Sequence, residues 1–232
     1  MSGPLAGRRE LLLADLEDLE GGLPVLCDNG EALVSIRSDP ALLLDESRSE
    51  IASRSDHFCY VRKGVLERLG VASERLPAGF AFLVKEGYRP AERQRLSYDN
   101  VYRKYASLHP ALSPAELRRL VSQYVAPIEV AGHPTGGAID LALARDGREL
   151  FLGTRFNDEP EETDGRTWFS ATGIGPEARE YRDMMAGCLQ PAGFVNYPPE
   201  WWHWSYGDRY WAALMGCEAI YGPVEEDSGS FS

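Results

Sequence analysis

The sequence predicts an α+β fold, a single domain in which helices flank a central, mostly antiparallel sheet. The 232 residues contain no internal repeat and no long Gly/Ser/Pro linker, which favours one domain. With 44% hydrophobic and 26% charged residues, the composition is that of an ordinary globular protein. Segments with helical and strand patterns are mixed, without the regular alternation that is typical of a parallel sheet.

The N-terminal half is expected to contain two helices and a strand. Residues 8–20 carry apolar positions at helical spacing, which predicts a short helix, and residues 28–57 are expected to be irregular. Residues 60–74 suit a second helix. Residues 80–85 form a short apolar run bounded on both sides by glycine, which predicts a buried strand.

The C-terminal half is expected to contain three helices and two strands that do not alternate regularly. A helical pattern covers residues 91–108, and a second helix is expected over residues 113–124 because Ser, Pro and Glu form a capping motif at its start. A glycine pair precedes a predicted strand over residues 138–144. Residues 176–191 suit a further helix, and residues 210–215 are predicted to form a closing strand.

Charge and hydropathy exclude some partners. The net charge is −12 and no basic run interrupts the acidic background, so neither nucleic acid nor an anionic membrane surface is an expected partner. No stretch approaches the roughly 18 apolar residues of a membrane span, and acidic residues interrupt the N-terminus where a secretion signal would need an apolar core. A cytoplasmic protein is therefore expected, with its oligomeric state left open.

Two segments concentrate residues that a metal hydrolase needs. Residues 132–140 contain His133 and Asp140, and residues 200–203 contain Glu200 and His203. Three nitrogen and oxygen ligands with an open fourth position describe a catalytic zinc site, and a carboxylate outside the metal shell then moves the proton. The sequence does not distinguish zinc from other divalent metals, and either segment alone would be weak evidence for a metal site.

Spacing supports these roles. If residues 138–140 form a strand, Asp140 points toward the same sheet edge as the loop that carries His133. Glu200 and His203 are three residues apart, so a turn brings both side chains to one face. The zinc site is therefore expected in a cleft at the sheet.

The chain resembles the D-alanyl-D-alanine dipeptidases of the vancomycin-resistance type, zinc D,D-peptidases of peptidase family M15. The resemblance runs from near Tyr60 almost to Tyr221. It is carried by four segments, residues 86–90, 133–140, 152–156 and 193–212. It implies a variable N-terminal segment over 1–55 that packs on the domain, a catalytic domain over 56–224 and a flexible acidic tail over 225–232.

The resemblance also implies roles for individual residues. His133, Asp140 and His203 would bind one zinc ion per chain, and Glu200 would be the general base. Arg89, in the Gly-Tyr-Arg-Pro segment, would stabilise the oxyanion. Trp201, Trp202 and Trp204 are expected to pack in the core and the pocket walls, with Trp202 lining the substrate pocket.

Two positions of the expected substrate pocket depart from the family. Ala131 replaces the usual Ser two residues before the first zinc His, and Asn157 replaces the usual acidic residue, with Asp158 one place later. The family's pocket holds the substrate ammonium there, and neither Ala131 nor Asn157 supplies a charge. Replacement charges could come from a shifted loop that holds Asp158, Glu159, Glu161 and Glu162.

The leading hypothesis is a zinc metallopeptidase that hydrolyses the amide bond of a small D-Ala-D-Ala-like dipeptide rather than polymeric cell-wall peptidoglycan. A metallo-amidase that acts on an N-blocked or non-dipeptide small molecule is the first alternative, favoured by Ala131 and Asn157. The second is a zinc-binding module without catalysis, against which Glu200 and Arg89 argue.

Overall fold

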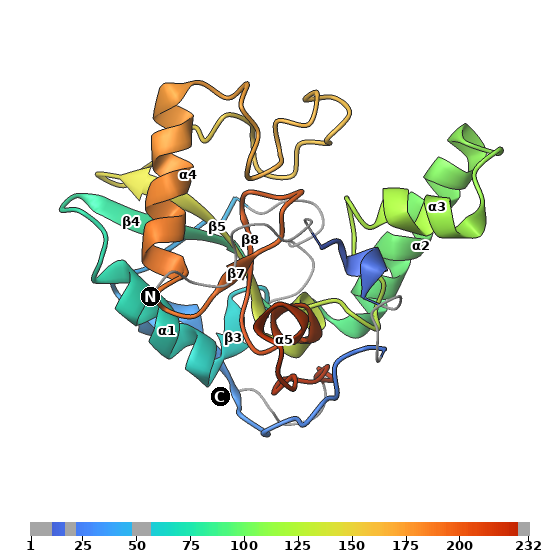
Figure 1. The fold of residues 1–232 in the computed structure, drawn as a ribbon. Coiled ribbons are helices and arrows are strands. Elements are labelled where there is room, and N and C mark those ends of the chain that lie inside the picture. Colours follow the sequence, from blue (N-terminus) through green and yellow to red (C-terminus); the bar gives the residue numbers. More distant parts are fainter. Residues whose placement is uncertain (1–10, 17–21, 48–56, 227–232) are drawn as a thin grey trace.

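The structure is a computed structural model that describes residues 11–16, 22–47 and 57–226. Its centre is a mixed sheet with the strand order β2-β4-β5-β8-β7, and β6 pairs with the end of β5 (Figure 1). The β2–β4 pair is parallel, and the other pairs in this sheet of the described chain are antiparallel. The predicted α+β fold with a mostly antiparallel sheet is confirmed. The strands are β2 (Leu43–Leu44), β4 (Phe80–Glu86), β5 (Ala138–Arg145), β6 (Arg148–Glu149), β7 (Val195–Asn196) and β8 (His203–Ser205).

The part of the chain that the structure describes contains five α-helices. Figure 1 shows α1 and α4 together at one side of the sheet, while α2 and α3 form a pair set apart from them. A separate two-stranded sheet joins β1 (Leu33–Ser35) to β3 (Tyr60–Arg62). The helices are α1 (Lys63–Ser73), α2 (Ala91–Leu108), α3 (Pro114–Val121), α4 (Pro176–Leu189) and α5 (Arg209–Met215).

Strand β5 runs through the hydrophobic core. Seven of its eight residues are buried, and it is hydrogen-bonded to β4 on one edge and β8 on the other. Its side chains Leu141 and Leu143 belong to one cluster with Leu69 of α1 and Met185 of α4. Burial of each such side chain contributes about 1.5–3 kcal/mol, so β5 is a rigid base for any residue it carries.

A buried arginine fixes the long loop between β6 and α4. Arg182 on α4 donates to the carbonyl oxygens of Leu152 at 2.8 Å, Arg166 at 2.8 Å and Trp168 at 2.6 Å. These carbonyls satisfy a guanidinium that is fully buried. The loop is thereby held against the sheet, which matters because it carries Asn157.

Most of the predicted elements are confirmed with small shifts at their ends. The strands over 80–85 and 138–144 correspond to β4 and β5, and the helices over 91–108 and 176–191 correspond to α2 and α4. The predicted capping motif starts α3. Ser113 N donates to Glu116 Oε2 at 2.8 Å, and Glu116 N donates to Ser113 Oγ at 3.3 Å.

The strand predicted over residues 210–215 is wrong, because this segment lies in helix α5. Asp208 Oδ1 accepts a hydrogen bond from Trp211 N at 2.8 Å, and Gly216 ends the helix with a φ of 67°. A short apolar run suits a helix or a strand, and these caps decide for the helix. The helix predicted over 60–74 begins only at Lys63, because the three residues before it pair with β1.

Some predictions fall partly outside the described residues. Of the helix predicted over 8–20, the structure describes residues 11–16, which hold the 3-10 turn η1 (Leu13–Asp15). The region predicted to be irregular contains β1, the 3-10 turn η2 (Ile36–Ser38) and β2 before residue 48. The predicted tail lies outside the described chain beyond residue 226. None of the helices in the described ranges is long and apolar enough to cross a membrane.

Candidate metal centre and active site

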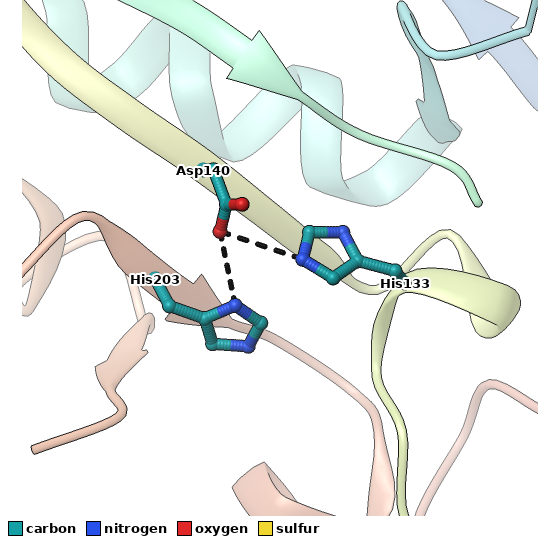
Figure 2. A group of neighbouring side chains, drawn as sticks. All are labelled: His133, Asp140 and His203. Carbon is teal, nitrogen blue, oxygen red and sulfur yellow. Dashed lines mark hydrogen bonds and ion pairs between the residues drawn. The ribbon is translucent and has the colours of Figure 1, made fainter. Parts of the chain in front are cut away.

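Neighbouring strands bring the three predicted metal ligands together. Asp140 on β5 lies directly opposite His203 on β8 and, across its other edge, opposite Glu86 on β4. His133 begins the 3-10 turn η4 (His133–Thr135), and two glycines separate this turn from the start of β5. The register of the sheet therefore brings His203 to Asp140, and the turn before β5 adds His133 to the same point (Figure 2).

The distances fit a metal ion. Asp140 Oδ1 lies 3.0 Å from His203 Nδ1 and 3.4 Å from His133 Nε2, and the three ligand atoms lie within 4.8 Å of one another. Metal–ligand bonds of about 2.0 Å in a tetrahedral arrangement place ligand atoms roughly 3.3 Å apart. The side chains are buried, with exposed fractions of 5% for His133, 3% for Asp140 and 8% for His203. This donor set is of the kind that binds zinc in catalytic sites.

The far side of each imidazole has a partner that sets its orientation. His133 Nδ1 lies 2.6 Å from the carbonyl oxygen of Gly87, to which it donates when Nε2 is the metal ligand. His203 Nε2 lies 3.5 Å from Ser205 Oγ, which leaves Nδ1 toward Asp140. A Cβ on Gly87 would lie 2.5 Å from the carbonyl oxygen of Tyr60, so only glycine fits there. The sequence did not identify Gly87 or Ser205 as partners.

The charges of the group reinforce one another. Burial would raise the pKa of Asp140, but the two imidazoles hold that pKa below its ordinary value. Burial would likewise lower the pKa of His133, and the charge of Asp140 outweighs it and raises that pKa. The carboxylate therefore stays ionised, which is the form that binds a metal.

Glu200 lies beside this group on the turn that precedes β8. Its Oε2 is 3.8 Å from His203 Nδ1, so the two side chains share one face as their spacing predicts. Asn196 Nδ2 holds the turn by donating to the carbonyl oxygens of Glu200 and His203, both at 2.9 Å. Burial, followed by the charge of Asp140, raises the pKa of Glu200 well above its ordinary value. A carboxylate whose pKa is raised accepts a proton more readily, which suits a general base.

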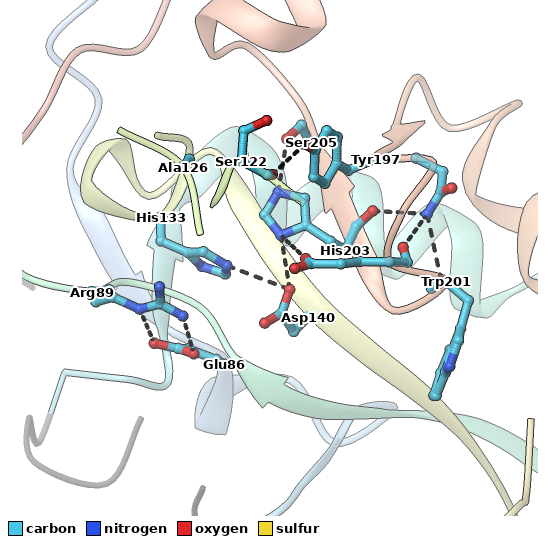
Figure 3. A network of polar contacts seen from close by, with 12 residues as sticks. Glu86, Arg89, Ser122, Ala126, His133, Asp140, Tyr197, Trp201, His203 and Ser205 are labelled. Carbon is cyan, nitrogen blue, oxygen red and sulfur yellow. Dashed lines mark hydrogen bonds and ion pairs between the residues drawn. The ribbon is translucent and has the colours of Figure 1, made fainter. Parts of the chain in front are cut away.

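Arg89 is held by three hydrogen bonds to two side chains. Its Nε and Nη2 donate to the Glu86 carboxylate at 2.7 and 2.6 Å (Figure 3). Its Nη1 donates to Gln94 Oε1 at 2.9 Å. Gln94 is itself fixed by donating to the carbonyl oxygen of Ala126 at 2.7 Å. A guanidinium has five N–H donors, so one on each terminal nitrogen is left over. Burial opposes the charge, but Glu86 outweighs it and raises the pKa of Arg89, so the side chain stays cationic.

One cavity collects these groups. A space of about 90 Å³ is lined by the three metal-ligand candidates and by Arg89 and Glu200. Of the predicted pocket residues, Ala131, Asn157 and Trp202 also line it. Asp140 and Glu200 are the acidic residues of this lining within the described chain, so no further carboxylate faces the cavity there. Leu13 of the N-terminal segment, which the sequence did not single out, completes part of the wall.

Asp158 lies in an adjoining cavity instead. This second cavity has a volume of about 260 Å³, and it shares Asn157, Glu200 and Trp202 with the first. Glu159 also lines the second cavity, whereas Glu161 accepts a hydrogen bond from the Tyr105 hydroxyl at 3.1 Å. These three acidic residues therefore do not bring a replacement charge into the cavity that contains the metal-ligand candidates.

Asp208 links helix α5 to the turn that carries His133. One carboxylate oxygen caps α5, and a Cβ on Gly132 would lie 2.3 Å from the other, so Asp208 contacts the turn that carries His133. Replacing Asp208 with alanine is expected to lower the free energy of unfolding by about 1 kcal/mol, because a helix cap is lost. Urea denaturation measures the change. Asp208→Asn keeps a capping side chain and is the control, and equal stability of the alanine variant and wild type would contradict the prediction.

Comparisons with known proteins place the chain in a family. A family model described as D-Ala-D-Ala dipeptidase matches residues 50–218. A D-alanyl-D-alanine dipeptidase of Synechocystis is 24% identical over 82% of this chain and 85% of its own length. A D-alanyl-D-alanine dipeptidase of Enterococcus faecium is 30% identical over 56% of this chain and 64% of its own length.

Solved structures show weaker likeness. VanYB in complex with D-alanine-D-alanine aligns with a TM-score of 0.42 and 17% identity, covering 77% of this chain and 94% of that one. The LdcB LD-carboxypeptidase aligns with a TM-score of 0.39 and 19% identity, covering 72% of this chain and 70% of that one. The family model matches well over half of the length of this chain. The chain therefore belongs to the Peptidase M15 family of D-Ala-D-Ala dipeptidases, which are zinc-dependent metallopeptidases.

Proposed function

We propose that the protein hydrolyses the amide bond of a small D-Ala-D-Ala-like dipeptide, with one zinc ion per chain bound by His133, Asp140 and His203. The observation that carries this proposal is the shared cavity, where the buried His-Asp-His group, a carboxylate and a guanidinium face one space. Membership of the dipeptidase family supports the same reaction. A binding module would need neither Glu200 nor Arg89 in that space.

Each group has a distinct task in the proposed reaction. A zinc ion at such a site supplies a Lewis acid that lowers the pKa of water to about 7 and polarises the substrate carbonyl. Glu200 accepts the proton of the attacking water and passes it to the leaving amine. Its raised pKa suits both steps, because the carboxyl group must hold the proton between them.

Arg89 is proposed to stabilise the oxyanion that develops on the substrate carbonyl. The Glu86 and Gln94 contacts fix the guanidinium before substrate binds, so no reorganisation is needed during the reaction. The ion pair with Glu86 makes Arg89 act as an oriented donor rather than as an isolated charge.

A dipeptide panel tests the proposal. The zinc-loaded protein would be incubated with D-Ala-D-Ala, L-Ala-L-Ala and the mixed pairs, with and without N-acetylation, and released amines would be quantified. Hydrolysis of D,D pairs that disappears in Glu200→Ala is the expected result. Equal rates for wild type and Glu200→Ala, or no hydrolysis of any member with zinc bound, would overturn the proposed activity.

Arg89→Lys is expected to lower kcat by about 100-fold, because a single ammonium cannot reproduce the fixed fork of donors. It keeps the charge opposite Glu86, so the fold should tolerate it. Arg89→Ala would instead leave the buried Glu86 carboxylate unpaired, at a stability cost of about 3–5 kcal/mol. Steady-state kinetics and urea denaturation of both variants separate the catalytic effect from the structural one. An Arg89→Lys variant with wild-type kcat would exclude the oxyanion role.

A further inference from the structure

The ring nitrogen of His203 that is turned away from Asp140 faces a buried hydroxyl group. His203 and Ser205 are two residues apart on β8, so their side chains lie on the same face of the strand. Ser205 Oγ lies 3.5 Å from His203 Nε2 (Figure 3). Ser205 is only 1% exposed, so its hydroxyl must find its partners within the protein.

A buried carboxylate reaches the same region from the loop after β8. Asp208 is 1% exposed, and its Oδ1 caps α5 by accepting a hydrogen bond from Trp211 N at 2.8 Å. Its Oδ2 is also buried, and it has no hydrogen-bond partner among the described residues. A buried carboxylate oxygen without a donor is costly, so the position of this oxygen calls for a specific reason.

The unpartnered oxygen of Asp208 lies near Ser205. A Cβ on Gly132 would overlap both Asp208 Oδ2 and the Cβ of Ala138, and Ala138 is the partner of Ser205 in the sheet. Burial raises the pKa of Asp208, and the Trp211 N–H and then the Ser205 hydroxyl act against that rise. The Ser205 hydroxyl is therefore the side-chain donor that is placed to serve this carboxylate.

The count of donors and acceptors fixes the direction of these contacts. A neutral imidazole carries one N–H, so His203 holds its proton on Nε2 when Nδ1 faces a metal ion. Ser205 Oγ then accepts that hydrogen bond, and its own proton is left for an acceptor. Asp208 Oδ2 is such an acceptor, because an ionised carboxylate only accepts.

We propose that Ser205 and Asp208 are positioning residues for His203, which donates through Nε2 to Ser205 Oγ while the Ser205 hydroxyl donates to Asp208 Oδ2. The inference rests on the proposed zinc site and adds two residues that are not ligands. This chain of hydrogen bonds fixes the orientation of the ring and makes Nδ1 a stronger ligand. Asp208 acts on the metal site through Ser205.

The test measures the zinc Kd of the purified protein by competition with a chromophoric chelator, without substrate. Ser205→Ala should raise the Kd by about 10- to 100-fold, the usual cost of losing the partner of a histidine ligand. Asp208→Asn should raise it by about 10-fold, although asparagine keeps an oxygen for Trp211 N and so preserves the helix cap. Ser73→Ala is the matched control, because it removes a buried hydroxyl at the end of α1, outside the active-site lining.

A double variant separates this chain from a general loosening of the site. Because Asp208 acts through Ser205, the protein with both substitutions should have the Kd of Ser205→Ala alone. Kd increases that multiply in the double variant would show that Asp208 acts by another route, such as its contact with the Gly132 turn, and would overturn the inference.

NMR of the zinc-loaded protein supplies a readout that a purely structural role would not change. Long-range proton–nitrogen spectra of the imidazoles should show His203 protonated at Nε2, with an N–H signal that broadens in Ser205→Ala. Protonation at Nδ1, or a wild-type Kd in both single variants, would overturn the inference and leave the proposed function standing. A wild-type protein that binds no zinc would overturn both.

Discussion

Replacing Glu200 with glutamine is expected to lower kcat by about 1000-fold, because general acid–base catalysis of this kind contributes about 100- to 10,000-fold. Glutamine has nearly the same shape and cannot accept the proton of water. The metal should stay bound, since Glu200 is not one of the three residues of the buried His-Asp-His group. Steady-state kinetics on the preferred dipeptide, together with the zinc content of the purified variant, measure both effects.

The same substitution should stabilise the metal-free protein. The pKa of Glu200 in the folded state lies above its value in an unfolded chain, because burial and the Asp140 charge oppose ionisation. The folded state therefore binds the proton more tightly, so Glu200 contributes most to stability below its unfolded pKa and loses that contribution as pH rises through its folded pKa. Glu200→Gln removes this loss, so its gain in Tm over wild type should grow from pH 5 to pH 8.

Glu67→Gln is the control for both measurements, because Glu67 is an exposed residue on α1 and does not line the active-site cavity. It should change neither kcat nor the pH dependence of Tm. A Glu200→Gln variant that keeps more than a tenth of the wild-type kcat would exclude Glu200 as the base. A variant less stable than wild type at pH 8 would show that the buried carboxylate is compensated in the folded state.

Removing the metal is expected to lower activity by at least about 1000-fold, because the pKa of water then returns from about 7 to 15.7. A ligand that binds only the folded state at 1000 times its Kd contributes about 4 kcal/mol to stability, so chelation should also lower Tm by roughly 10 °C. Zinc titration into the chelated protein should restore both properties together, since the same site is responsible for both.

Asp140→Asn distinguishes loss of the metal from loss of the fold. Asparagine preserves the hydrogen-bonding shape between the two imidazoles but removes the charge that a divalent ion needs. The variant should stay folded and should not regain activity at zinc concentrations that saturate wild type. Near-infrared or visible spectra of the cobalt-substituted forms would report the change in ligands. Full activity of Asp140→Asn would rule out this carboxylate as a metal ligand.

The parts of the fold with a strong local pattern were predictable from the sequence. β4 and β5 are apolar runs next to glycine, and α3 begins with a capping motif, so each follows from a few adjacent residues. The error at 210–215 has a local cause as well. Asp208 and Gly216 flank that segment as helix caps, and reading them would have predicted α5.

The contacts that hold the site residues in place were harder to predict from the sequence. His133 Nδ1 contacts the carbonyl oxygen of Gly87, which lies 46 residues earlier. Every residue has a backbone carbonyl, so the residue types do not indicate which one makes this contact. Glu86 was part of the matching segment, yet its pairing with Arg89 depends on how the chain turns after β4. The predicted ligands are together because of strand register, whereas their roles and the domain boundaries at 55 and 224 stay predictions.

Leu13 raises a question about how such enzymes diverge. It lines the active-site cavity, yet it lies before residue 50, where the family match begins. Its segment is attached through the Asp15–Arg119 ion pair and a bond from the Tyr210 hydroxyl to the carbonyl oxygen of Leu11 at 3.0 Å. Exchange of residues 11–16 between homologues would therefore change the shape of the active-site cavity without changing the residues that are proposed to carry the reaction.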